Sequence, residues 1–131
     1  MIQFNIPEKP PTVNQMYFNV PKRGRVKTTR YQKWISDATC DIELLKPRVE
    51  PITTAKYGLI IRLKKHASSD YSNYVKPIED LLVNLGLTPD DKHNLLPICI
   101  GQEEAGVSIA ILDEQEARGL ISFINKSLDT D

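Results

Sequence analysis

Tyr57-Gly58-Leu59-Ile60-Ile61-Arg62-Leu63-Lys64-Lys65 is the stretch of this sequence that decides the fold. Its β-branched, aromatic and apolar residues make it the clearest strand in the chain. A short polar loop follows, and the segment from about residue 72 to residue 85 carries apolar side chains at helical spacing. Gly86 is a typical residue to end such a helix, and Pro77 is tolerated because it falls near the first turn. The core face of this helix is expected to consist of Tyr74, Ile78, Leu81, Leu82 and Leu85.

The chain before this strand predicts a strand, a long loop and a helix. Residues 2–6 alternate between apolar and polar side chains, as in a strand with one buried face. Residues 7–28 hold four prolines and most of a basic cluster, and we expect a long loop there, of a length that usually serves a function. Thr28 or Thr29 can cap a helix that runs to about Lys46, before Pro47 ends it and residues 47–55 form a loop. The apolar stripe of that helix consists of Tyr31, Trp34, Ile35, Ala38, Ile42 and Leu45.

The remainder of the chain predicts two strands and a last helix. Residues 95–102 and 106–113 are expected to pair as a hairpin, with a tight turn around Glu103-Glu104-Ala105. A helix from Glu114 to about Leu128 follows, and we expect its apolar side to pack on the sheet of the same chain. The order of elements predicts one α+β domain over residues 1–131, with helices packed on one face of a small mixed sheet.

Composition limits the class of protein. The 131 residues are 40% hydrophobic and 26% charged, which is typical of a globular domain with a real core. No apolar run approaches the length of a membrane span, and the N-terminus does not resemble a signal peptide, so no membrane partner is expected. Cys40 and Cys99 have no CxxC spacing, which favours buried, reduced thiols in a cytoplasmic protein. Phosphate-binding glycine loops, dinucleotide fingerprints and Ser-His-Asp patterns are missing.

Charge is distributed unevenly along a chain whose formal net charge is zero. Residues 1–89 hold 14 Lys and Arg against 8 Asp and Glu, whereas residues 90–131 hold 3 against 9. This asymmetry favours contact with nucleic acid, and a solvated basic loop is the ordinary alternative. The densest basic cluster consists of Lys22, Arg23, Arg25, Lys27, Arg30 and Lys33.

Acidic residues gather around the helix of residues 72–85. Asp70 precedes it, Asp80 lies within it, and Asp90-Asp91 follows it. Like charges repel, so a divalent cation gives a reason for the clustering, and oxygen-only ligands suit Mg²⁺ or Mn²⁺ and a phosphodiester substrate. Spacings of three and four place Asn73, Lys76 and Asp80 on one side of the helix, where the Asp90-Asp91 pair can meet them.

Each of these residues also has an ordinary structural interpretation. Asp90-Asp91 can simply begin a turn, and Asp80 can pair with Lys76 on the helix surface. Ser72 or Asn73 can serve only as a helix cap. His66 and His93 flank the acidic residues, but a zinc site would need more His or Cys at tighter spacing. Residue chemistry alone leaves both interpretations open.

The run Asp70-x-Ser72-Asn73-x-x-Lys76-x-x-x-Asp80-x-Leu82, followed by Asp90-Asp91, resembles the signature of the RusA family of Holliday-junction resolvases. The segment Pro10-Pro11-Thr12-Val13-Asn14 is similar to the opening of that family. The resemblance implies a RusA-like fold and a Mg²⁺-dependent homodimeric endonuclease. Such enzymes cut four-way DNA junctions during recombination and repair, and phages or prophages often encode them.

Carried over by position, the resemblance makes Asp70 and Asp91 metal-binding catalytic aspartates and Lys76 the essential lysine. Asn73 and Asp80 match other motif positions. The DNA-binding residues are expected from the charge asymmetry instead, and they are Lys22, Arg23, Arg25, Lys27 and Arg30. Ser72 departs from the pattern, because the family has a further catalytic aspartate there. A neutral hydroxyl binds Mg²⁺ less well than a carboxylate, although water, Asp80 or Asp90 can recover part of the loss.

Three functions therefore remain as hypotheses. The first is a structure-selective junction endonuclease, which needs two active sites related by a two-fold axis. The second is a junction-binding protein with weak or no nuclease activity, which Ser72 motivates. The third is a metal-dependent hydrolase of nucleotides or other small phosphate esters, which should have an enclosed pocket where a junction nuclease has an open basic face.

Overall fold

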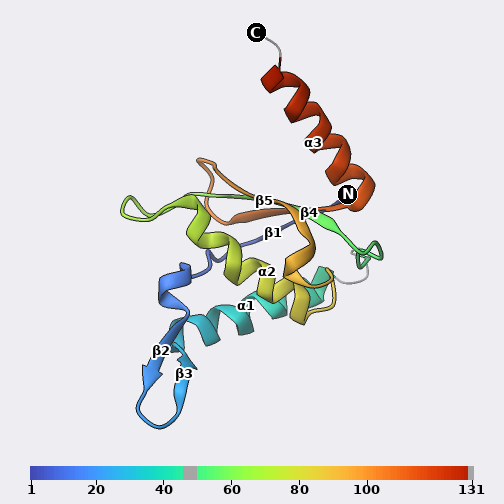
Figure 1. Ribbon diagram of the computed structural model, residues 1–131. Helices are drawn as coiled ribbons and strands as arrows, with labels where there is room; N and C mark the ends of the chain where they lie inside the picture. Colours follow the sequence, from blue (N-terminus) through green and yellow to red (C-terminus); the bar gives the residue numbers. More distant parts are fainter. Residues whose placement is uncertain (46–49, 130–131) are drawn as a thin grey trace.

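The computed structural model describes residues 1–45 and 50–129 (Figure 1). The strands are Ile2–Ile6 (β1), Tyr17–Val20 (β2), Gly24–Lys27 (β3), Tyr57–Leu63 (β4), Asn94–Gly101 (β5) and Val107–Asp113 (β6). The α-helices are Thr29–Leu45 (α1), Val75–Asn84 (α2) and Glu114–Asp129 (α3). Short 3₁₀ turns cover Val13–Gln15 (η1), Tyr71–Tyr74 (η3) and Asp91–His93 (η4). The α+β class is confirmed, and the expected end of α1 at Pro47 lies outside the described residues.

Four of the strands form a mixed sheet in the order β1-β6-β4-β5. β4 is antiparallel to β6 and parallel to β5, so the predicted hairpin between the last two strands is wrong. The connection after β5 crosses the end of β4, where the Gln102 amide donates to the Leu63 carbonyl at 3.1 Å. β4 is the strand with the most buried side chains, and its position between β6 and β5 pairs both of its backbone edges.

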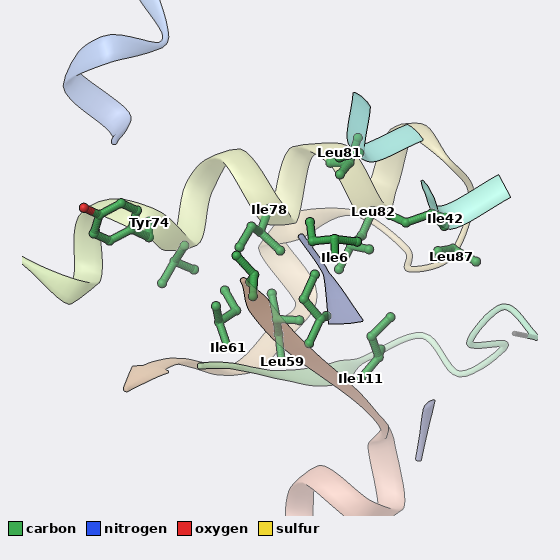
Figure 2. Close-up of a cluster of buried hydrophobic side chains, with 14 of the residues drawn as sticks. Ile6, Ile42, Leu59, Ile61, Tyr74, Ile78, Leu81, Leu82, Leu87 and Ile111 are labelled. Carbon is green, nitrogen blue, oxygen red and sulfur yellow. The ribbon is translucent and has the colours of Figure 1, made fainter. Parts of the chain in front are cut away.

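The hydrophobic core lies between one face of this sheet and helices α1 and α2 (Figures 1 and 2). Leu59 and Ile61 of β4 are fully buried there, opposite Ile78 and Leu82 of α2. The apolar faces expected for both helices are confirmed. From α1, the core receives Tyr31, Trp34, Ala38 and Ile42.

Helix α3 begins on the other face of the sheet, so the expectation that all helices share one face is wrong for it. Gly58 points to this second face, and a Cβ built on it would lie 3.0 Å from the Cβ of Ala117. The absence of a side chain at Gly58 therefore lets the first turns of α3 approach. Beyond them α3 projects from the body (Figure 1), and Phe123 and Leu128 are 67% and 75% exposed. Among the described residues, no helix is long and apolar enough to cross a membrane.

The expected long loop at residues 7–28 is instead folded into η1 and a two-stranded ribbon, β2–β3. Lys22 and Gly24 have positive φ values of 68° and 77°, which allow the tight turn between the strands. The prolines of this segment lie outside the paired residues, where they cost no ladder hydrogen bond. The ribbon projects from the body on the side away from α3 (Figure 1).

The helix expected from residue 72 begins as the 3₁₀ turn η3, and α2 starts only at Val75. Pro77 explains the delay, because in a helix begun earlier it would lack the amide that bonds to Asn73 and would clash with that carbonyl. Gly86 ends the helix as expected, with a φ of 73°. The Leu87 amide donates to the Leu82 carbonyl at 3.0 Å, which completes the C-terminal cap.

The two cysteines are free thiols. The expectation of burial is wrong for Cys40, which is exposed on the outer side of α1. Cys99 is half-buried beside the core, and burial raises the pKa of its thiol to about 11.

Candidate metal and nucleic-acid site

Lys76 joins the two acidic segments of the sequence motif. It lies in the first turn of α2, and its Nζ donates to Asp80 Oδ1 at 3.1 Å, one turn further along. The same Nζ donates to Oδ2 of Asp91, the first residue of η4. The polar side of α2 therefore meets the Asp90-Asp91 segment, as the residue spacing predicts. The pairing of Asp80 with Lys76, considered above as the ordinary interpretation, is also present.

Two carboxylates thus converge on one ammonium group in a partly exposed setting. The hydrogen bond from Lys76 is the main cause that lowers the pKa of Asp91, and the hydrogen bond to Asp91 is the main cause that raises the pKa of Lys76. The contribution of Asp91 to stability is present above its ordinary pKa of 3.8 and is lost as the pH falls through the lowered value. The contribution of Lys76 to stability is complete below its ordinary pKa of 10.5 and is lost as the pH rises through the raised pKa. Both groups are therefore charged at neutral pH.

Other residues hold η4 against α2. The Asp90 side chain accepts a hydrogen bond from the Lys92 amide at 3.0 Å, so Asp90 has the turn-forming role considered above. Glu79 Oε2 accepts from Asn94 Nδ2 at 2.8 Å, which ties α2 to the start of β5. Burial is the main cause that raises the pKa of Glu79. Glu79 was not among the predicted site residues, and its place beside Asp80 is the only signal that the sequence offers for it.

Asp70 lies at the N-cap position of η3, where its side chain makes no capping hydrogen bond. Its backbone carbonyl accepts from the Asn73 amide at 3.1 Å. Ser72 is exposed within the turn, so neither Ser72 nor Asn73 is the cap that the ordinary interpretation proposed. The Asp70 carboxylate is thus left available for a ligand.

The loop before Asp70 is held by the hydroxyl of Tyr74, whose ring is fully buried. That hydroxyl lies 2.7 Å from Ser69 Oγ and accepts from the His66 amide at 3.2 Å. Figure 2 shows it pointing outward from the apolar cluster. Helical spacing predicts only a core role for Tyr74, because the periodicity of apolar residues does not indicate what the hydroxyl group of a buried tyrosine will contact. Tyr74 therefore fixes the loop that presents Asp70.

Tyr74→Phe should lower the free energy of unfolding by about 1–3 kcal/mol, because the His66 amide loses its partner while the buried ring stays in place. Urea denaturation followed by circular dichroism measures the change. Tyr71→Phe is the matched control, since its hydroxyl makes no side-chain hydrogen bond within residues 1–45 and 50–129. Equal stability of the two variants would contradict the role assigned to the Tyr74 hydroxyl.

The described carboxylates do not form a complete metal-binding cluster. Within residues 1–45 and 50–129, no group of three or more His, Cys, Asp or Glu side chains is arranged to hold a metal ion. Asp80 and Asp91 nevertheless approach one cation, the ammonium of Lys76. Mg²⁺ usually binds proteins through one or two carboxylates and keeps waters or substrate phosphates as its other ligands. The oxygen donors therefore fit Mg²⁺ in their chemistry, with fewer ligands than the RusA pattern implies.

The base of the basic ribbon lies close to Asp80. A cavity of about 240 Å³ is lined by Tyr17 and Lys27 of the ribbon, Tyr31 of α1 and Asp80 of α2. The Arg25 guanidinium stacks 4.2 Å from the centre of the Tyr17 ring, which anchors the ribbon's cationic side to its base. Lys27 at the base of the ribbon and the candidate metal residue Asp80 thus line one cavity.

Aromatic residues near the ribbon divide into core and surface groups. Tyr31 and Trp34 are buried, and Trp34 Nε1 donates to the Glu8 carbonyl at 3.0 Å. The expectation that Trp34 packs in the core is therefore confirmed. Phe18 is 50% exposed on the ribbon, so its ring is accessible for stacking on bases.

Neither a scan against protein-family models nor a search of curated proteins finds a match to this chain. The resemblance to the RusA family thus rests on the spacing of the motif residues. The structure adds that Lys76 of that motif contacts both Asp80 and Asp91.

Proposed function

We propose that this protein is a Mg²⁺-dependent endonuclease that resolves four-way DNA junctions in recombination and repair, in the manner that the RusA resemblance implies. The observation that carries the proposal is the contact of Lys76 with both Asp80 and Asp91, beside a projecting ribbon that is rich in Lys and Arg. A structural ion pair alone would not need a second carboxylate at this point, nor a basic ribbon next to it.

Asp70 and Asp91 would hold Mg²⁺, with Asp80 or Asp90 as additional oxygen donors. The ion would supply an activated water and neutralise charge on the scissile phosphate. The ammonium of Lys76 would contact a phosphate or leaving oxygen once a DNA phosphate replaces Asp91 as one of its partners. The loop fixed by Tyr74 would keep Asp70 aligned with these groups.

The decisive experiment incubates the protein with a synthetic four-way junction, with and without Mg²⁺, and with a linear duplex of the same sequence. We expect paired, symmetric nicks in the junction that depend on Mg²⁺, and little cutting of the duplex. Cleavage of small phosphate esters in place of the junction would support the hydrolase hypothesis instead.

A junction-binding protein with weak or no nuclease activity is the second candidate. It is favoured by Ser72, together with the missing three-carboxylate group in the described part of the chain. Tight binding of the junction without nicks at any Mg²⁺ concentration would establish this function and overturn the first.

The ribbon is expected to bind DNA phosphates without base specificity. Replacing Lys22, Arg23, Arg25 and Lys27 by Gln should weaken binding to every DNA. The dependence of log K on log salt should flatten by up to about 0.9 for each phosphate that the variant no longer neutralises. Fluorescence anisotropy over a range of salt concentrations measures the slope. Replacement of the exposed Lys56 and Lys64 by Gln is the control, and an unchanged slope in the ribbon variant would leave the ribbon as a solvated surface feature.

A homodimer is expected, because paired nicks need two active sites. The projecting half of α3, with Phe123 and Leu128 exposed, provides apolar surface for the contact. Light scattering at micromolar concentration should give twice the 14.9 kDa chain mass, and Phe123→Glu with Leu128→Glu should give the monomer. Leu44→Glu on α1, at an 81% exposed position, is the control and should remain dimeric. A monomeric wild-type protein would contradict the expectation.

A further inference from the structure

A second cavity, of about 470 Å³, is lined in part by Ser69 and Asn73, which lie on either side of Asp70 in the chain. Three segments that are distant in sequence build it: the region of η1, the first turn of α1, and the loop that leads into η3. Its lining carries cationic and neutral polar groups and no carboxylate. The lining residues are Thr12, Asn14, Gln15, Arg30, His66, Ser68, Ser69 and Asn73.

The walls of this cavity are held in place before any ligand binds. Thr28 Oγ1 donates to the Gln15 carbonyl at 2.6 Å and accepts from the Tyr31 amide at 3.2 Å, which fixes η1 against the start of α1. On the opposite wall, Ser69 Oγ donates to the His66 carbonyl at 3.0 Å and contacts the buried Tyr74 hydroxyl. Both walls are therefore held by hydrogen bonds within the protein.

The charged member of the lining has no partner within the described chain. Arg30 is exposed and makes no side-chain hydrogen bond or ion pair with residues 1–45 or 50–129. The side chains of Asn14 and Asn73 likewise have no hydrogen-bond partner among those residues. A guanidinium and two amides that face one polar cavity form a donor set suited to an anion with several oxygen atoms.

We propose that this cavity binds one backbone phosphate of the DNA strand that enters the candidate active site. Arg30 supplies the charge, and Asn14, Asn73 and Ser68 supply neutral donors. Asp70 lies between two of the lining residues, Ser69 and Asn73, in the chain, and its backbone carbonyl accepts a hydrogen bond from the Asn73 amide at 3.1 Å. A phosphate held here would set the position of the next phosphodiester relative to Asp70 and Lys76. This inference rests on the proposed function, since it presumes a DNA ligand.

The test measures binding without metal, so that it does not depend on cleavage. Junctions that each carry one neutral methylphosphonate near the crossover are titrated against the wild-type protein, Arg30→Gln and Asn73→Ala. Arg62→Gln is the matched control, because Arg62 is an exposed arginine whose side chain projects from the sheet face opposite α1 and α2. At one position, a methylphosphonate should lower the affinity of the wild-type protein for the junction several-fold. The same methylphosphonate should not lower the affinity of Arg30→Gln, which already lacks the contact with that phosphate. Arg30→Gln should also reduce the salt slope by up to about 0.9.

The proposal would be overturned if, at every methylphosphonate position, the loss of junction affinity were as large in Arg30→Gln as in the wild type. It would also be overturned if Arg62→Gln had the same effect as Arg30→Gln. Competition by a nucleoside monophosphate at the same concentration as the junction would assign the cavity to small phosphates and also overturn it. If one methylphosphonate position weakens binding of the wild type but not of Arg30→Gln, and no junction is cleaved, the phosphate cavity is supported and the nuclease is refuted. If the junction is cleaved but no methylphosphonate position distinguishes Arg30→Gln from the wild type, the nuclease is supported and the phosphate cavity is refuted. A protein that binds no DNA would refute both proposals.

Discussion

Asp70→Asn is expected to abolish cleavage of a four-way junction while leaving junction binding intact or improved. The substitution removes a negative charge that would hold Mg²⁺ and that also repels phosphate. A carboxylate about 4 Å from a unit charge is worth roughly 4 kcal/mol at an effective dielectric constant of 20, which corresponds to about three decades in metal affinity. Single-turnover cleavage and anisotropy titrations measure the two effects separately.

The fold should survive this substitution, because the Asp70 side chain makes no capping hydrogen bond and its backbone contact with Asn73 is retained. Asp41→Asn on α1 is the charge-matched control and should cleave at the wild-type rate. Wild-type cleavage by Asp70→Asn would show that Asp70 is not a metal ligand, and the proposed site would then have to be abandoned.

Ser72→Asp is expected to lower the Mg²⁺ concentration needed for half-maximal cleavage by one or more decades. It restores the carboxylate that the RusA resemblance implies, at an exposed position of the turn η3 that leads from Asp70 toward Lys76. The stability of the fold should change little, because Ser72 is neither buried nor a cap. Cleavage rates over a Mg²⁺ titration give the half-maximal concentration.

The control for Ser72→Asp is Ser36→Asp, which adds the same charge at an exposed position of α1. If the wild-type protein is inactive and Ser72→Asp restores cleavage, the natural protein is a junction binder that lacks one ligand. If the wild-type protein cleaves and Ser72→Asp changes nothing, residue 72 does not contact the metal, and the role assigned to it by the resemblance is wrong.

The candidate site illustrates which contacts local spacing predicts. Lys76 and Asp80 are four residues apart on a helix, so their contact follows from helix geometry. The approach of Asp91 to Lys76 was predicted from the polar side of the helix that Lys76 and Asp80 share, and it is present. The roles of Glu79 and of the Tyr74 hydroxyl were missed, because each depends on a partner that only the packed structure brings near.

The ribbon and the phosphate cavity could not be predicted for a related reason. Prolines dominate residues 7–28 and favour a loop, whereas the pairing of β2 with β3 depends on a turn whose positive φ values include a lysine. Asn14, Arg30 and Asn73 are distant in the chain, and no periodic pattern connects them. Their convergence follows from the way η1 and α1 pack beside η3.

By itself, the sequence determined the elements whose signals are local. These are the apolar run of β4, the helical spacing of α1, α2 and α3, the stop at Gly86 and the grouping of acidic residues around Lys76. The tertiary structure alone decided that β4 separates β5 from β6, that α3 starts on the second face through Gly58, and that Arg30 and Asn73 share a cavity. Periodicity reports which side of an element is apolar. Strand order and the meeting of distant polar groups are instead set by competition among all the surfaces that the chain must bury at once.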